Sequence, residues 1–525
     1  MDPFRMWRTG SLCLVMATFA AADVALGQDA APVLRATATA MGADSVRSIQ
    51  YGGAGWNAPV GQGFTSNDDW PRVEVTGYNR VVDYVNRSAL EEWTRRQGSY
   101  PPRGGGGLPI DEWGSAVNGE WKQRFFVNGE FAWNLDGNST MPAPAPRLSS
   151  SAAGLRSEFR QLEIWLTPHG FIKAALVAKD ATALPVTLEG QPKTIVSFTA
   201  LGKYRVNGTI TADNLVERVQ TWMENPVFGD MVHEHRYTEY RDYNGVKFPS
   251  LIHSHQGDPR LNPGHNSQEI RVTSVRVNPD GQAFPVPENI RKAAANPVTV
   301  RVAADQVSPG VWRIAGESHN SIAIEFRDFV AVVEAPQDEK RSLAVIAEVQ
   351  RLIPKKPIEY IVNTHYHFDH SGGLRTYVAQ GATVVTHAGN REFYERVFFY
   401  PAPRTLEPDL LSARYPWFRG NRLPAIEGVT SKYVISDGVR TLDVLATQGV
   451  DHESNMLLAY LPTERLLVHA DMYAPPAGAA PARITPGARQ LWDNITRLKL
   501  NVDRHVPVHG TVWMHDAFAR IMAPR

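Results

Sequence analysis

Six consecutive positions of this chain carry four side chains of the types that bind metal ions. His365, His367, Asp369 and His370 follow the apolar segment Ile358–Val362 and precede two glycines. Residues two apart in an extended segment point to the same side, so His365 and His367 can grip one metal ion. The turn that follows can direct Asp369 and His370 towards a second ion. An incidental histidine cluster on a solvated loop is the alternative, and the joint pattern argues against it.

Three residues further along the chain extend this pattern, which resembles the metallo-β-lactamase superfamily and its His-x-His-x-Asp-His signature. His452 matches the third histidine of that family. Asp471 follows an apolar segment, where the bridging acid of the family belongs, and His509 stands where its last ligand belongs. The resemblance covers roughly residues 298–525.

By resemblance, two metal ions are bound. The first would be held by His365, His367 and His452, and the second by Asp369, His370 and His509, with Asp471 bridging or binding the second. Imidazole and carboxylate donors suit zinc best, so we expect two Zn²⁺, with iron or manganese as alternatives. Many members of the family carry Asp where this chain has Glu334, a position that orients the histidine loop rather than binding metal.

The resemblance implies a hydrolase that uses a metal-bound hydroxide on an ester, amide, lactam, lactone or related bond. Asp369 would be the catalytic residue, because it can ligate metal, orient the nucleophile and relay its proton. For binding of a small-molecule substrate the candidates are Tyr366 inside the motif, Tyr473 after Asp471, and Trp417. Trp417 lies in a long loop, residues 400–428, that could cover the site.

Two other functions fit the same residues. An oxidoreductase could use iron in this ligand set, and a periplasmic binding or carrier protein could hold an apolar ligand in the N-terminal region. Two His-x-His pairs, at His233/His235 and His253/His255, could each bind a metal from one face of a strand. We interpret them instead as part of a polar sheet face, since no carboxylate stands at a motif spacing.

The elements that must position the motif alternate between strands and helices. Strands are expected at Val330–Val333 and Ile358–Val362, and helices at Glu339–Leu352 and Ala488–Leu498. We therefore predict an α/β catalytic domain at 297–525, and the αββα sandwich follows from the resemblance.

Residues 29–296 are expected to form a separate α+β domain with an antiparallel sheet. Helical spacing is expected at Ser88–Arg96 and Ala152–Trp165, and short strands follow from Thr194 onward. Asn244-Gly245 is a strong hairpin signal within these strands. The role of this domain is not indicated by any motif.

Residues 1–28 have the basic start, short apolar run and small-residue exit of a secretory signal peptide. The apolar run is too short for a bilayer, which needs about 20 residues, so we expect a periplasmic or secreted protein without a stable membrane anchor. The only cysteine, Cys13, lies in this segment, which leaves the mature chain without a thiolate ligand. Lys plus Arg and Asp plus Glu both total 54, and this zero net charge argues against a nucleic-acid partner.

Overall fold

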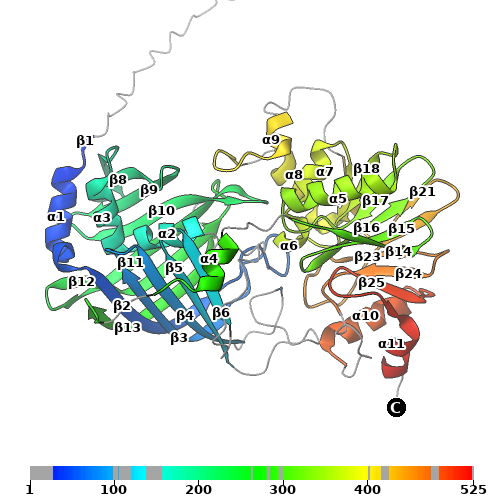
Figure 1. Ribbon diagram of the computed structural model, residues 1–525, viewed down its shortest axis with the longest axis horizontal. Helices are drawn as coiled ribbons and strands as arrows, with labels where there is room; N and C mark the ends of the chain where they lie inside the picture. The colour runs from blue at the N-terminus through cyan, green and yellow to red at the C-terminus, as the bar shows by residue number, and fades with distance from the viewer. Residues whose placement is uncertain are drawn as a thin grey trace, which may run out of the picture.

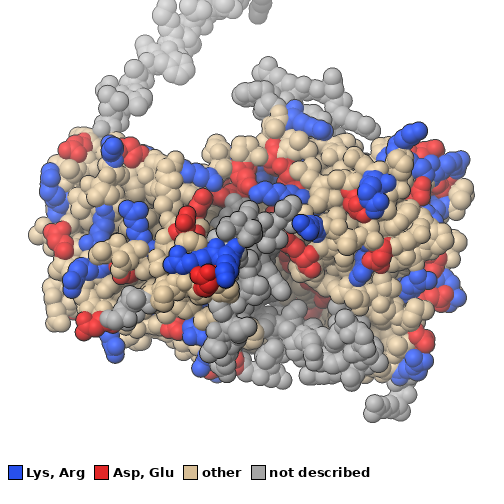
Figure 2. All heavy atoms as spheres, in the orientation of Figure 1, with Lys and Arg blue, Asp and Glu red and all other residues tan. Residues whose placement is uncertain are grey.

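The computed structural model contains two domains, each built around its own sheets (Figure 1). The structure describes residues 28–97, 104–105, 120–136, 157–261, 264–280, 284–294, 300–399, 402–414, 425–473 and 484–522. Both domains are mainly sheet, with an antiparallel-sheet domain preceding an α/β domain, as the sequence predicts. On the face shown in Figure 2, basic and acidic side chains are interspersed, in keeping with their equal totals.

The N-terminal domain is one 13-stranded sheet in which all neighbouring strands are antiparallel. In sheet order the strands are β1 (Gln28–Asp29), β7 (Thr182–Leu188), β8 (Gln191–Ala200), β9 (Tyr204–Thr211), β10 (Val216–Asn225), β11 (Gly229–Tyr243), β12 (Val246–Gly257), β13 (His265–Val277), β2 (Ser48–Asn57), β3 (Val73–Asp83), β4 (Ser88–Gln97), β5 (Trp121–Asn128) and β6 (Phe131–Asp136).

Three helices pack on one face of this sheet and close its core (Figure 1). They are α1 (Ala31–Met41), α2 (Ser157–Leu166) and α3 (Pro168–Val177), while α4 (Glu288–Ala294) lies beside β6. Leu34 of α1, Leu162 of α2 and Phe171 of α3 are fully buried against apolar residues of the strands. The helix predicted at Ala152–Trp165 is present from Ser157 onward as α2, and residues 152–156 lie outside the described part of the chain.

The prediction of a helix at Ser88–Arg96 is wrong, because these residues form strand β4 between β3 and β5. Its Glu and Arg residues favour a helix locally, but cross-strand pairs decide the outcome. The Trp93 ring packs on Tyr78 with centroids 4.8 Å apart, and Arg96 pairs with Glu74 at 2.8 Å. Side-chain packing between strands outweighs the intrinsic preference of the segment.

The C-terminal domain has two sheets packed face to face. The first sheet, in order, is β14 (Ala303–Ser308), β15 (Val311–Gly316), β16 (His319–Glu325), β17 (Val330–Val333), β18 (Ile358–Val362), β19 (Thr383–His387) and β20 (Ile426–Val429). The second is β21 (Lys432–Ser436), β22 (Thr441–Ala446), β23 (Leu457–Leu461), β24 (Leu466–His469), β25 (Arg504–Pro507) and β26 (Trp513–Met514).

Alternating apolar residues give these strands two buried faces, and helices cover the outer ones. Ile322 and Leu457 point between the sheets, whereas Ala323 and Leu458 point outward to helices. The helices are α5 (Glu339–Leu352), α6 (Phe368–Ser371), α7 (Leu374–Ala379), α8 (Arg391–Phe399) and α9 (Leu410–Arg414) on the first sheet's side, and α10 (Pro486–Arg497) and α11 (His515–Met522) on the second's. The layers are those of an αββα sandwich.

Among the helices that the structure describes, none combines the length and the apolar character needed to cross a membrane. The predicted signal segment lies outside the described residues, apart from its last residue, Gln28.

Candidate metal centre

The histidine motif lies in the loop between β18 and α6. Hydrogen bonds among buried polar side chains hold this loop in place. The Asn363 amide donates to the carbonyl of His365 at 2.6 Å, and Thr364 Oγ1 donates to Glu334 Oε2 at 2.5 Å. Glu334 is fully buried, and its Oε2 also lies 3.4 Å from Nδ1 of His370. The carboxylate of Glu334 therefore orients the loop, as expected for this position.

Two glycines allow the loop to pack closely beside α5. A Cβ on Gly372 would lie 1.9 Å from the carbonyl oxygen of Gln337, and one on Gly373 would lie 2.0 Å from Ser342 Oγ. Real Cβ atoms do not approach other atoms so closely, so a side chain at either position would displace the loop. The glycines after the motif are needed for this contact.

Three imidazole nitrogens converge at one side of the loop. His452 Nε2 lies 3.0 Å from His367 Nδ1 and 3.3 Å from His365 Nε2. His365 and His367 are fully buried, and His452 comes from the segment between β22 and β23. One nitrogen can donate only one proton, so hydrogen bonding alone does not satisfy three nitrogens that face each other. A shared cation satisfies all three at once.

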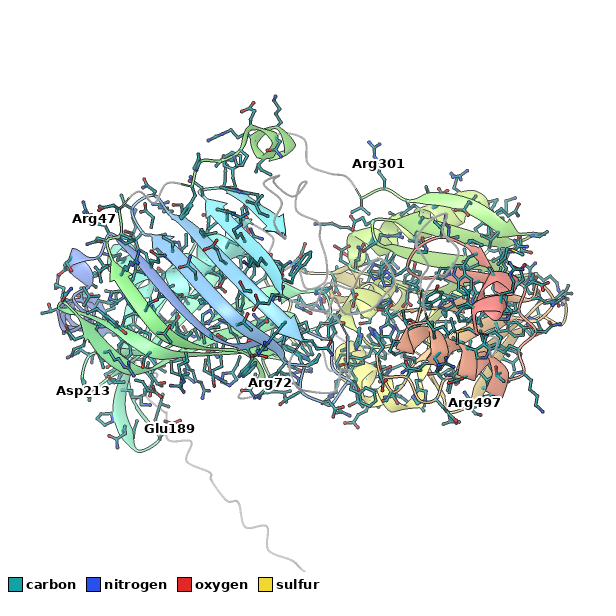
Figure 3. The ribbon with its side chains drawn as sticks, turned by 90° about the horizontal axis from the view of Figure 1, so that it is seen from below. Arg47, Arg72, Glu189, Asp213, Arg301 and Arg497 are labelled. Carbon is teal, nitrogen blue, oxygen red and sulfur yellow. The ribbon has the colours of Figure 1, made fainter. Side chains whose placement is uncertain are left out.

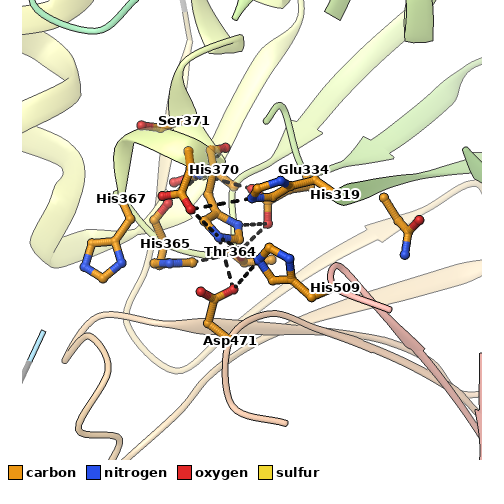
Figure 4. A network of polar contacts seen from close by, with 12 residues as sticks. His319, Glu334, Thr364, His365, His367, His370, Ser371, Asp471 and His509 are labelled. Atoms are coloured by element: carbon orange, nitrogen blue, oxygen red, sulfur yellow. Dashed lines mark hydrogen bonds and ion pairs between the residues drawn. The ribbon is translucent and has the colours of Figure 1, made fainter. Parts of the chain in front are cut away.

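A second set of donors lies beside the first (Figure 4). Nε2 of His370 and Nε2 of His509 are 3.3 Å apart, and each is 3.0 Å from Asp471 Oδ1. The other oxygen of Asp471 lies 3.2 Å from His452 Nε2, so this carboxylate touches both sets. Asp369 Oδ2 lies 3.7 Å from His370 Nε2.

The charges of these groups match a cation site. Burial alone would raise the pKa of Asp471, but His370, His509 and His452 outweigh burial and hold that pKa well below its usual range. Burial and the neighbouring histidines His370 and His367 lower the pKa of His365 well below its ordinary value. Burial would lower the pKa values of His370 and His509, but Asp471 outweighs burial and raises both. Carboxylates gathered with imidazoles are the donor set that zinc, iron and manganese accept. The structure therefore brings all seven expected ligands into one cluster.

His319, at the start of β16, joins the second set although the sequence does not single it out. Its ring is buried, and its ring centroid lies 4.2 Å from that of His509. Its Nε2 lies 3.6 Å from Asp369 Oδ2 and makes no hydrogen bond within the described part of the chain. Nitrogens of His319, His370 and His509 lie within 4.8 Å of one another. No spacing signal marks His319, since it is 46 residues before the motif begins.

The comparison with protein families agrees with this geometry. Residues 314–509 match the model of the metallo-beta-lactamase superfamily. The C-terminal domain belongs to this superfamily. The match contains every expected ligand and His319, and membership supports a metal-dependent hydrolase.

Solved structures of metallo-beta-lactamases are similar to this chain. One from Pontibacter korlensis is 14% identical, with 42% of this chain and 97% of the other covered and a TM-score of 0.30. FIM-1 from Pseudomonas aeruginosa, in a mono-zinc form, is 18% identical, with 42% and 93% covered and a TM-score of 0.30. DIM-1 is 13% identical, with 42% and 95% covered and a TM-score of 0.31.

The three expected substrate residues have different surroundings. Tyr366 is buried, and its ring lies 5.1 Å from that of His367, at the edge of the histidine cluster. Tyr473 is also buried, and its ring contacts Trp513 and Phe518 in the core beneath α11. Trp417 lies outside the described residues.

The N-terminal domain contains a further convergent cluster at one of the predicted His-x-His pairs. His233 Nε2 lies 2.5 Å from Glu163 Oε1, and His235 Nε2 lies 3.2 Å from Glu163 Oε2. The carboxylate that faces both histidines comes from α2 rather than from their own strand. Arg80 Nη1 lies 3.5 Å from the same carboxylate, so a cationic side chain already neutralises it. His253 instead contacts Glu269 and Asn266.

Proposed function

We propose that this protein is an exported, dinuclear metal-dependent hydrolase of the metallo-beta-lactamase superfamily. One observation carries the dinuclear proposal: the two oxygens of Asp471 face nitrogens of both donor sets at 3.0–3.2 Å. A carboxylate shared in this way could serve as a ligand to a cation in each set. We propose zinc as the metal, because imidazole and carboxylate donors suit it best.

Bound cations would lower the pKa of water and polarise the oxygen of the scissile bond, which is the chemistry of hydrolysis. The protein's own groups must then orient the reacting water and accept its proton. Asp369 is placed for this role, because Oδ2 faces His319 and His370. Burial would raise its pKa, but these two histidines hold the pKa well below its usual range, so the carboxylate is ionised at neutral pH. An ionised carboxylate can accept a proton.

The class of bond follows from the superfamily and the donor set, and we propose an ester, amide, lactam, lactone or related bond of a small molecule. Export is proposed on the sequence pattern of residues 1–28, and a periplasmic or extracellular location follows from it. The test of hydrolysis is a panel of such substrates with purified protein of known metal content. We expect activity that follows metal occupancy and falls by orders of magnitude in Asp369→Ala. Unchanged hydrolysis in that variant would contradict the proposal.

A second function, an iron-dependent oxidoreductase, is favoured by His319. With this residue the second set holds three imidazoles and two carboxylates, Asp369 and Asp471, which is more than the four donors of tetrahedral zinc. Iron and manganese accept such larger donor sets. Metal analysis together with oxygen consumption separates the two functions, because a hydrolase consumes no oxygen.

A further inference from the structure

The two domains share one hydrophobic core next to the metal centre. Phe228 of the N-terminal domain packs on Phe368 of α6, with ring centroids 4.8 Å apart. Ala58 and Trp70 belong to the same buried cluster as Tyr366 and Phe368. An interface of this kind is apolar and continuous with a domain core, so it holds the domains in one arrangement.

Within this interface, the segment between β2 and β3 extends from the N-terminal sheet onto the histidine loop. Figure 3 shows Arg72, at the end of this segment, on the side of the sheet that faces the C-terminal domain. Gly61 has a φ of +73°, and a Cβ there would lie 2.2 Å from the ring of Phe368. The Phe64 carbonyl accepts from Ser454 N at 3.0 Å, two residues beyond His452. The segment therefore contacts the chain next to His367, at Phe368, and the chain near His452, at Ser454.

Gln62, in this segment, donates from Nε2 to Oδ1 of Asp369 at 2.7 Å. The Gln62 side chain is buried, and a Cβ on Gly105 would lie 2.1 Å from its Oε1, so Gly105 leaves room for the amide. An ionised carboxylate only accepts hydrogen bonds, so the amide nitrogen must be the atom that faces it. With Oδ1 held in this way, Oδ2 is left facing the nitrogens of His319 and His370.

The next residue, Gly63, acts on the first donor set through its backbone. Its carbonyl oxygen lies 2.8 Å from His367 Nε2. A carbonyl only accepts, so Nε2 carries the proton and Nδ1 keeps its lone pair. That lone pair faces His452 Nε2. Hydrogen bonds of this kind fix the tautomer and ring orientation of histidine ligands.

We propose that Gln62 and Gly63 are positioning residues of the metal centre, so that the N-terminal domain completes the active site built by the C-terminal domain. Gln62 sets which oxygen of Asp369 faces the second donor set, and the Gly63 carbonyl sets which nitrogen of His367 faces the first. The proposal rests on the metal centre proposed above, but it does not depend on which bond is cleaved.

The test compares two variants of the full-length protein in the same segment. Gln62→Met keeps the length of the side chain and removes its N–H donor. Asn67→Leu is the matched control, because Asn67 accepts only a long 3.4 Å contact from Arg396, away from the metal ligands. The readouts are zinc affinity, by competition with a chromophoric chelator, and the visible absorption spectrum of the cobalt-substituted protein. Loss of a hydrogen bond to a metal ligand typically costs 10–100-fold in affinity.

We expect Gln62→Met to bind the weaker zinc ion about 10–100-fold less tightly, with an altered cobalt spectrum, and Asn67→Leu to match the unmodified protein. In Gly105→Ala the new Cβ would press on the Gln62 amide and also on the ring of His367, so weaker zinc binding is expected there as well. Wild-type affinity and spectrum in Gln62→Met would overturn the proposal. If no substrate is hydrolysed, the proposed function fails, whereas the metal titrations still decide the role of Gln62.

Discussion

Glu334→Gln tests whether a buried carboxylate beneath the histidine loop tunes the metal centre. An amide keeps the volume and one acceptor oxygen, so Thr364 can still donate to it. The amide nitrogen would then face Asn363 Nδ2, now 3.5 Å from Oε1, and place a donor against a donor. The carboxylate charge near His370 Nδ1 is lost as well. Hydrogen bonds to a charged group contribute about 1.5–3 kcal/mol, against about 1 kcal/mol for neutral ones.

From these contacts we expect two measurable effects. Affinity for the metal at the second donor set should fall about 10–100-fold, which is roughly 1.4–2.8 kcal/mol. The metal-free protein should lose roughly 1–2 kcal/mol of unfolding free energy in urea titrations. Glu325→Gln is the matched control, because Glu325 pairs with Lys356 outside the centre and should change metal affinity by less than about twofold. Unchanged metal affinity in Glu334→Gln would refute this account of Glu334.

Three further predictions concern other parts of the molecule. His319→Gln should weaken metal binding at the second donor set by at least about tenfold in chelator competition. An unchanged metal affinity would show that His319 does not belong to that set. Leu457→Ala, between the two sheets, should cost about 2–5 kcal/mol in urea unfolding, whereas Leu343→Ala on the exposed face of α5 should cost less than about 0.5 kcal/mol. Burial opposes ionisation of Asp409, but hydrogen bonds from Arg375 and the charge of Arg404 outweigh it and hold its pKa below the usual range. A lowered folded-state pKa stabilises the protein above the unfolded pKa of about 3.9 and loses this contribution as pH falls further, so Asp409→Asn should flatten the acid side of the stability profile, and an unchanged acid limb would contradict this assignment.

The metal ligands that share a local pattern could be predicted from the sequence. His365, His367, Asp369 and His370 lie within six residues after an apolar strand, and this joint pattern is typical of metal binding. Asp471, His452 and His509 are placed by the resemblance to the superfamily, and for Asp471 an apolar strand, β24, leads to the position. These predictions depend on short-range order, which the chain carries in its residue types and spacing.

The remaining parts of the site depend on contacts between distant segments. Gln62 is 307 residues from Asp369, and Gly63 is 304 residues from His367. A glutamine and a glycine in a loop have no spacing that indicates such a role. Strand β4 also could not be predicted from its local sequence. Its charged residues favour a helix, and its pairing with β3 and β5 makes it a strand. Tertiary packing, rather than local preference, decides these cases.

The central claim is that two metal ions are bound by this set of histidines and aspartates. Anomalous diffraction from crystals of the full-length protein, recorded at the zinc, iron and manganese absorption edges, tests it most directly. The account predicts two peaks, one among His365, His367 and His452 and the other between His370 and His509, with Asp471 adjacent to both. A single peak, or peaks only at Glu163, would contradict it.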